Sequence, residues 1–342
     1  MEKRRRVCYN EPTTNAGHGG PPRRTKFPAG RFPGIEGAVP RICCVGWTPG
    51  AAGHAIFGGI SLDYISAVFM GVLQGIAEFL PISSSGHLAL FQHFFGMEDF
   101  ESQQLFFTVM LHFGTLISVC IYYWRDILDM IREFFLGIGA LFSGRGGRER
   151  AATPPARRLV LMIIVATLPL FLILPVKDVI DSAMRNVTFV SVALLATGFL
   201  LFFSDRLAKG RKTAKTATLL DALAVGCAQA VGTLPGISRS GITISAGMLR
   251  GYDRSFAVRF SFLMSLPAVL GATLLELKDA LEEGLDPAIL PYCLVGMVIA
   301  GVVGYFAIRL VNLLADKGKF GSFAYYCWAA GAVSLVAGFL VK

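Results

Sequence analysis

Residues 74–87 read QGIAEFLPISSSGH, and a partial copy of this stretch, QAVGTLPGISRSG, follows 155 residues later at 229–241. Each copy is a short apolar segment that carries polar residues, breaks at a proline and restarts through a Ser-Xaa-Ser-Gly turn. Proline ends a helix and serine begins one well, so each copy predicts two helices joined by a turn. Polar, broken helices are costly at membrane depth unless they line a cavity, so the two copies predict a site.

The composition around the two motifs is that of an integral membrane protein. The 342 residues are 54% hydrophobic and only 16% charged, with a mean hydropathy of +0.59. A soluble domain carries about a quarter charged residues. Of the net charge of +9, residues 1–50 contribute +6, with nine Lys and Arg against three Asp and Glu. The positive charge is therefore concentrated in one tail and does not indicate nucleic-acid binding.

The hydropathy pattern predicts six transmembrane helices and two shorter, interrupted segments. The six spans are expected at about 103–124, 159–175, 188–205, 256–275, 289–309 and 322–341. The interrupted segments, about 61–96 and 219–250, contain the two motifs and fit re-entrant helical hairpins better than full spans. We therefore expect an all-α integral membrane fold with six transmembrane helices plus two re-entrant helical hairpins.

Loop charges orient these segments, because cytoplasmic loops are enriched in Lys and Arg. The basic loops at 125–158, 205–218 and 310–321 are predicted to be cytoplasmic, whereas the acidic loop at 276–287 is predicted to lie outside. With six spans, the two hairpins then enter the membrane from opposite sides. Two similar hairpins with opposite entry indicate an inverted-topology repeat.

The predicted domain organisation is a single membrane domain, 56–342, preceded by a tail. The first repeat of this domain covers about 61–205 and the second about 219–341. Residues 1–55 are rich in Gly, Pro and Arg and lack periodicity, so we interpret them as a disordered basic tail or a mis-called start.

The first motif carries a carboxylate, hydroxyl groups and an imidazole. Gln74 and Glu78 are four residues apart and share one helix face. An ionised Glu in a membrane segment needs a partner or a metal, and a helix-pairing carboxylate is the alternative interpretation. The serines at 83–85 are good helix caps, and free N–H groups at a helix start bind anions. His87 follows Ser84 by three residues, either as the partner of a nucleophile or as a helix-pairing donor.

The second motif supplies a cation. A guanidinium at membrane depth favours a phosphate or carboxylate partner, which makes Arg239 the central residue of this motif. Hydroxyl groups surround it in the sequence, from Ser238, Ser240 and Thr243. The alternative is an ion pair between Arg239 and Glu78 that only locks the hairpins, although it would also bring the motifs together. Carboxylate, hydroxyl, imidazole, guanidinium and helix N-termini together suit phosphoryl transfer.

Other chemistries agree less well with these residues. No acid is placed to orient His87 as in a Ser-His-Asp triad, and the HExxH spacing of a zinc protease is absent. His112, at LHFGTL in a predicted span, is interpreted as a packing or hydrogen-bonding residue. A transporter is the competing class, because inverted repeats with broken helices are typical of transporters. Hydrolysis is favoured because it needs a nucleophile and an acid or base, which Ser84 and His87 supply.

The stretches QGIAEFLPISSSGHL and LPGISRSGITISAGMLRG resemble the two signature motifs of the undecaprenyl-diphosphate phosphatases, the bacitracin-resistance membrane proteins. The resemblance covers about 60–342. It implies hydrolysis of undecaprenyl diphosphate to undecaprenyl phosphate and inorganic phosphate, which recycles the lipid carrier of peptidoglycan synthesis. A polyprenyl-phosphate flippase is the alternative. The implied location is the bacterial inner membrane, with a multi-pass chain and an active site open to the outer, periplasmic side.

The resemblance also implies residue roles. Ser84 is the expected nucleophile with His87 as its acid/base partner, or His87 itself attacks, and Arg239 clamps the diphosphate. Glu78 and Gln74 are the expected ligands of a divalent cation, Mg²⁺ or Ca²⁺, with Glu78 as the one carboxylate. The expected substrate-binding residues are Gln74, Ser83, Ser85, Gly86, Ser238, Ser240 and Thr243. The expected partners are the polyprenyl diphosphate and membrane lipids, with a homodimer as the candidate assembly and no nucleic acid.

Overall fold

The computed structural model describes residues 64–95, 101–142, 154–184, 186–283 and 287–340, and the predicted tail at 1–55 lies outside them. Helices make up most of the described chain. Its only β-type pairing is one isolated bridge between Lys212 and Tyr252. The prediction of an all-α fold is therefore confirmed.

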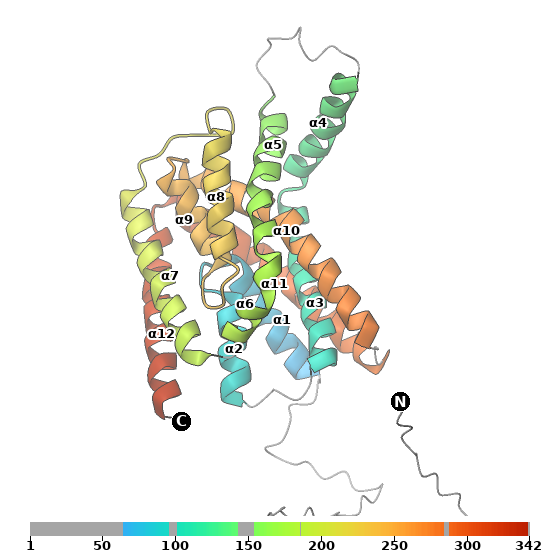
Figure 1. Cartoon of the computed structure of the whole chain (residues 1–342), viewed down its shortest axis with the longest axis vertical. Coiled ribbons are helices and arrows are strands. Elements are labelled where there is room, and N and C mark those ends of the chain that lie inside the picture. The colour runs from blue at the N-terminus through green and yellow to red at the C-terminus, as the bar shows by residue number, and fades with distance from the viewer. Residues whose placement is uncertain (1–63, 96–100, 143–153, 185, 284–286, 341–342) are drawn as a thin grey trace, which may run out of the picture. The chain divides into compact units, whose positions relative to one another are not determined.

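Each motif forms two helices with a turn between them, as predicted (Figure 1). The first motif lies on α1 (Tyr64–Phe79) and α2 (Ser84–Phe95), and the second on α8 (Leu219–Val231) and α9 (Arg239–Leu249). The other helices are α3 (Glu101–Tyr122), α4 (Trp124–Phe142), α5 (Pro155–Thr167), α6 (Lys177–Met184), α7 (Val187–Leu207), α10 (Arg254–Glu283), α11 (Leu290–Asp316) and α12 (Phe323–Leu340). Short 3-10 helices occur at Leu168–Leu172, Leu174–Val176, Pro287–Ile289 and Phe320–Ser322.

Five helical stretches of the described chain are long and apolar enough to cross a membrane. They are Pro155–Leu172, Val187–Leu207, Arg254–Lys278, Pro287–Asp316 and Phe320–Leu340. The remaining predicted span, about 103–124, corresponds to Phe106–Tyr122, which qualifies only together with Trp124–Gly139 across an 83° bend. The described residues therefore hold five candidate spans, or six if the bent pair counts as one, and the chain is a multi-pass membrane protein.

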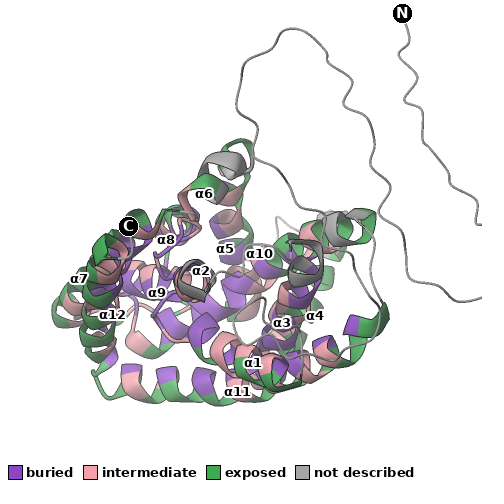
Figure 2. Cartoon of the chain, turned by 90° about the horizontal axis from the view of Figure 1, so that it is seen from below, coloured by how far each residue is buried: buried purple, intermediate pink, exposed green. Residues whose placement is uncertain are grey.

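The outer faces of these helices are apolar, as lipid contact requires. Exposed residues follow the outer sides of α7 and α12 (Figure 2). They include Phe199 and Phe203 on α7, Val302 on α11 and Val333 on α12. Large apolar side chains that stay exposed along several neighbouring helices would be a liability in water and are expected in a bilayer.

Glycines allow the helices around the first motif to pack closely. A methyl group at Gly75 of α1 would lie 2.8 Å from the carbonyl oxygen of Ala300 on α11. A methyl group at Gly114 of α3 would lie 2.2 Å from the carbonyl oxygen of Met297, also on α11. Helices in lipid associate through such close backbone approach, so α11 becomes the common support of α1 and α3.

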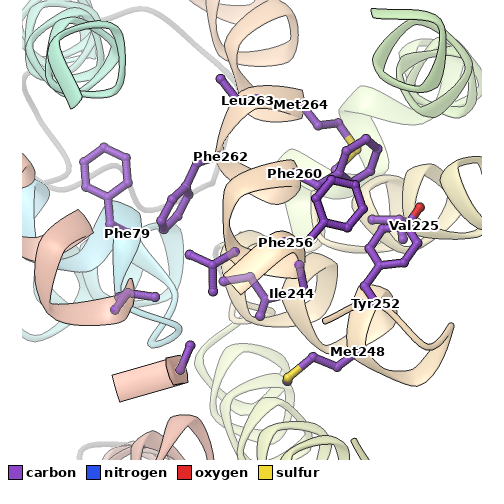
Figure 3. Packing of buried hydrophobic residues seen from close by; sticks show 14 of the residues in the cluster. Phe79, Val225, Ile244, Met248, Tyr252, Phe256, Phe260, Phe262, Leu263 and Met264 are labelled. Carbon is purple, nitrogen blue, oxygen red and sulfur yellow. The ribbon is translucent and has the colours of Figure 1, made fainter. Parts of the chain in front are cut away.

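A buried hydrophobic cluster, which includes several aromatic rings, packs against helices of both motifs (Figure 3). Phe79, next to Glu78 at the end of α1, packs edge to face on Phe262 of α10, with ring centroids 5.4 Å apart. Tyr252 packs on Phe260 in the same cluster, which also receives apolar side chains of α8 and α9. The end of α1, through Phe79, and the helix α9 therefore both pack against α10.

Candidate active site

The turns of the two motifs lie against each other. A methyl group added at Gly86 would lie 2.9 Å from the Cα atom of Gly236, which itself has a φ of +86° that favours glycine. Ser240 Oγ donates a hydrogen bond of 3.3 Å to the carbonyl oxygen of Leu80. Two stretches 155 residues apart in the sequence thus form one compact unit.

Both turns end in the same helix cap. Ser83 Oγ accepts a hydrogen bond of 3.2 Å from the backbone N–H of Gly86, and Ser238 Oγ accepts one of 3.1 Å from the N–H of Gly241. The predicted capping role is confirmed for Ser83, and Ser238 makes the equivalent hydrogen bond. Ser83 also has a φ of +69°, an uncommon left-handed conformation for a residue with a side chain. The matching caps agree with the pairing of the motifs position by position.

Gly86→Ala is expected to destabilise the protein, because the new methyl group meets the backbone of Gly236 and the second turn must shift. Overpacking of this kind costs roughly 1–3 kcal/mol. Thermal unfolding of the detergent-purified protein measures the effect. Gly139→Ala is the matched control, since Gly139 is exposed and its added methyl group has nothing within 4 Å. Equal melting temperatures for the two variants would contradict the contact between the turns.

The carboxylate of Glu78 joins the two motifs. Glu78 is 7% exposed, and its Oε1 forms an ion pair with Nη2 of Arg239. Its Oε2 accepts hydrogen bonds from Gln74 Nε2 at 3.0 Å and from Ser84 Oγ at 3.1 Å. The ion pair considered as an alternative from the sequence is therefore present, and it gathers the predicted carboxylate, amide, hydroxyl and guanidinium at one point.

His112 of α3 belongs to the same group, where it is the hydrogen-bonding residue that the sequence allowed, although its place at the site was not predicted. Its Nδ1 lies 3.2 Å from Gln74 Nε2 and 3.7 Å from Glu78 Oε2. The ionised carboxylate of Glu78 can only accept hydrogen bonds, so the side chain of Gln74 must present its N–H₂ group to Glu78. The same N–H₂ group faces His112, whose Nδ1 is therefore assigned as an acceptor. The signal available from sequence was an ionisable ring inside an apolar span, which marks a functional candidate by default.

His87 occupies a different position. Its Nδ1 lies 2.7 Å from the carbonyl oxygen of Ser83, and its Nε2 lies 2.8 Å from the hydroxyl oxygen of Tyr326. Its ring stacks on Tyr326 with centroids 5.6 Å apart. No hydrogen bond joins His87 to Ser84 in the described part of the chain, so the role of His87 as acid/base partner stays a prediction.

The remaining predicted hydroxyl groups bond mainly to one another and to the backbone. Ser83 Oγ lies 3.5 Å from Ser85 Oγ, and Ser238 Oγ lies 3.2 Å from Ser240 Oγ. Thr243 Oγ1 lies 2.8 Å from the carbonyl oxygen of Arg239, one turn before it. These hydroxyl groups keep both helix starts rigid around the ion pair.

A cavity of about 760 Å³ opens beside this group. Its polar lining consists mainly of Glu78, Ser83, Ser84, Ser85, His112, Gln229, Thr233, Ser238, Arg239 and Ser240. Its apolar wall comes from the 3-10 turn Leu168–Leu172 and from the half of α10 that follows Pro267. Gln74, Gly86, His87 and Thr243 are not among the described lining residues. The cavity is large enough for a small amphiphile with an anionic head and an apolar body.

Comparison with known proteins assigns the chain to a family. The family model described as Bacitracin resistance protein BacA matches residues 67–333. The chain belongs to the BacA family. An undecaprenyl-diphosphatase of Alkaliphilus metalliredigens is 41% identical over 79% of this chain and 97% of its own length. Undecaprenyl-diphosphatases of Halothermothrix orenii and Methanosphaera stadtmanae are 40% and 38% identical, each over 80% of this chain and 98% of their own length.

Glu78 is a candidate ligand for a hard divalent cation in this BacA-family chain, although both of its carboxylate oxygens are engaged by neighbouring side chains. In the described residues no group of three or more His, Cys, Asp or Glu side chains could hold a metal ion. Mg²⁺ commonly needs only one or two carboxylates, because substrate phosphates and water complete its shell. Glu78 supplies one such carboxylate when its ion pair with Arg239 opens, and Gln74, whose Nε2 faces Glu78 here, would have to turn its Oε1 to the ion.

Proposed function

We infer that this protein hydrolyses undecaprenyl diphosphate to undecaprenyl phosphate and inorganic phosphate. The observation that carries this inference is the cavity in which the buried Glu78 and the partly buried Ser84 and Arg239 meet an apolar wall. A diphosphate head suits the polar side chains of the cavity, and a prenyl tail suits its apolar wall. The BacA-family relatives named above carry the name of the same reaction.

Substrate binding changes the partner of Arg239. In the structure Arg239 is paired with Glu78. A diphosphate in the cavity offers a planar guanidinium several anionic oxygens, which makes it a strong competitor for that guanidinium. Once Arg239 has turned to the diphosphate, the carboxylate of Glu78 is left with the hydroxyl of Ser84 and the amide of Gln74, and can accept a proton.

We propose that Ser84 attacks the terminal phosphorus. The bond from Oγ to phosphorus forms as the bond from phosphorus to the bridging oxygen breaks, and the electron pair leaves on the lipid monophosphate. Glu78 Oε2, which lies 3.1 Å from Ser84 Oγ, takes the proton. The oxygen of a water molecule then bonds to the phosphorus as the bond from phosphorus to Ser84 Oγ breaks, Oγ takes the proton back from Glu78, and inorganic phosphate leaves. Arg239 and the N–H groups at the two helix starts offset negative charge on the phosphoryl oxygens. Attack by His87 is the predicted alternative.

We propose that a divalent cation, Mg²⁺ or Ca²⁺, is held by Glu78 and Gln74. When bound, the ion supplies further positive charge to the phosphoryl oxygens. The carboxylate of Glu78 supports the proposal, because Mg²⁺ is commonly bound through one or two carboxylates and the phosphates of its substrate. Chelation by EDTA is expected to lower the rate of phosphate release, with recovery on adding Mg²⁺ or Ca²⁺.

We propose that the membrane domain, 56–342, contains six spans and two re-entrant hairpins in an inverted repeat. The matched caps at Ser83 and Ser238 support the repeat, whose halves cover about 61–205 and 219–341. The basic loops support a site open to the periplasmic side of the bacterial inner membrane, where the reaction recycles the lipid carrier of peptidoglycan synthesis. A homodimer stays a prediction.

His112→Leu is expected to lower kcat/KM roughly 10- to 100-fold, the usual effect of losing a residue that orients the groups at the reacting centre. The ring nitrogen that fixes the Gln74 amide is lost, and Glu78 loses its alignment. His112→Gln keeps an acceptor at a similar reach and is expected to stay within a few-fold of wild type. Phe113→Leu, on the exposed neighbour, is the control. Equal losses in the Leu and Gln variants would contradict the positioning role.

Phosphate release from a C15 or C55 polyprenyl diphosphate by the detergent-purified protein tests the function. We expect one inorganic phosphate per molecule of lipid and a lipid monophosphate as the other product. Saturable binding of lipid phosphate without release of phosphate would instead favour the flippase.

A further inference from the structure

The side chain of Gln229 on α8 is buried without a hydrogen-bond partner. The residue is 1% exposed, and neither its Nε2 nor its Oε1 has a partner among the described residues. A buried polar group in that state is unfavourable, and most such groups in folded proteins are paired. An amide with a purely structural role would be expected to have a hydrogen-bond partner within the protein. The unpaired side chain of Gln229 therefore indicates a group that binds a ligand.

Gln229 lies where a ligand would arrive. It lines the large cavity together with Glu78, Arg239 and Ser240, and the same four residues line a second, small pocket behind the ion pair. The small pocket has a volume of about 10 Å³, which is room for roughly one water molecule. The amide therefore stands at the junction between the two spaces, beside the guanidinium that is proposed to turn to the substrate.

The two motifs use their glutamines differently. Gln74 and Gln229 hold the same position in the two copies, at the start of QGIAEF and QAVGTL. The amide nitrogen of Gln74 is occupied by Glu78 and His112, whereas both amide atoms of Gln229 are free of partners in the described chain. Gln74 therefore binds side chains of the protein itself, whereas the amide of Gln229 is available to a ligand.

We propose that Gln229 is a substrate-binding residue whose Nε2–H donates a hydrogen bond to a phosphoryl oxygen of the lipid diphosphate. The proposal rests on the proposed function. A phosphoryl oxygen is a strong acceptor, and a hydrogen bond to a charged group is stronger than one between neutral groups. The amide adds a donor to the charge of Arg239 without adding a second cation at membrane depth.

Gln229→Met tests the proposal, because methionine has a similar shape and no polar atoms to leave unpaired. We expect a KM for the polyprenyl diphosphate roughly 10- to 100-fold higher, the fold-change of a lost hydrogen bond to a charged group, with a melting temperature equal to or above wild type. Asn312→Leu is the matched control for stability. The amide of Asn312 donates to the Tyr123 hydroxyl oxygen at 3.0 Å and to the Ile308 carbonyl oxygen at 2.9 Å, so its loss should lower the melting temperature.

Gln229→Glu separates a phosphate ligand from a cation. A carboxylate next to an incoming diphosphate should raise KM further than Met does, whereas a carboxylate at a cation site should leave KM unchanged or lower. An unchanged KM in the Met variant, or a KM in the Glu variant at or below wild type, would overturn the proposal. Failure of wild-type protein to release phosphate would overturn the proposed function, which these variants do not test.

Discussion

Replacing Arg239 by Ala is expected to lower kcat/KM for phosphate release by roughly 1,000-fold or more, the scale on which an arginine acts in phosphoryl transfer. The guanidinium of Arg239 lines the cavity and also forms an ion pair with the carboxylate of Glu78. Arg239→Lys keeps the charge and loses the planar fork, so it should recover part of the activity. The rate of phosphate release at several substrate concentrations gives kcat/KM for the wild type, Arg239→Ala and Arg239→Lys.

A matched control separates the loss of activity caused by removing Arg239 from the general effect of breaking an ion pair that involves an arginine. Arg259 is paired with Asp126 and is more exposed than Arg239, away from the cavity. Arg259→Ala should therefore keep catalytic activity close to wild type. Because removing Arg239 leaves a buried carboxylate unpaired, its variants also need a melting temperature. A folded Arg239→Ala protein with activity within a few-fold of wild type would contradict the assignment.

Ser84→Ala is expected to lower the rate of phosphate release roughly 1,000-fold or more, because the attacking oxygen is lost while the charges that bind the diphosphate remain. Substrate binding should change little, so the loss should appear in kcat. Ser322→Ala, on an exposed serine of a distant turn, is the control. Full activity in Ser84→Ala, with none in His87→Ala, would instead make His87 the attacking residue.

The local part of the site could be predicted from the sequence because each motif carries its own geometry. Proline, serine and glycine at fixed spacing specify a helix end, a cap and a new helix start, and the structure has these at Ser83 and Ser238. The ion pair between Glu78 and Arg239 was the alternative interpretation, which charge suggested because each side chain needs a partner at membrane depth. These are interactions that short sequence patterns encode.

Contacts across the fold could not be predicted in the same way. His112 reaches Gln74 from 38 residues further along the chain, and no helical or strand periodicity links two such positions. Its place depends on α1 and α3 both packing on α11 through Gly75 and Gly114. The unpaired amide of Gln229 is likewise a property of its surroundings and not of its motif.

The sequence also missed a helix. The segment 125–158, expected as a cytoplasmic loop, contains most of α4, Trp124–Phe142. This helix carries acids and arginines among exposed apolar residues such as Leu128 and Phe135, so a search for continuous apolar runs passes over it. The ion pair between Asp126 and Arg259 of α10 then fixes its start.

If the two motifs act on one diphosphate, Glu78 and Arg239 are not independent, and a double-mutant cycle of phosphate release measures their coupling. The cycle compares wild type, Glu78→Gln, Arg239→Lys and the double variant. If each single variant loses roughly 100-fold, independent groups would multiply to roughly 10,000-fold. Glu78 and Arg239 are in contact and serve the same reacting centre. We therefore expect the activity of the double variant to lie within roughly tenfold of the activity of the less active single variant. A loss equal to the product of the two single losses would contradict a shared site.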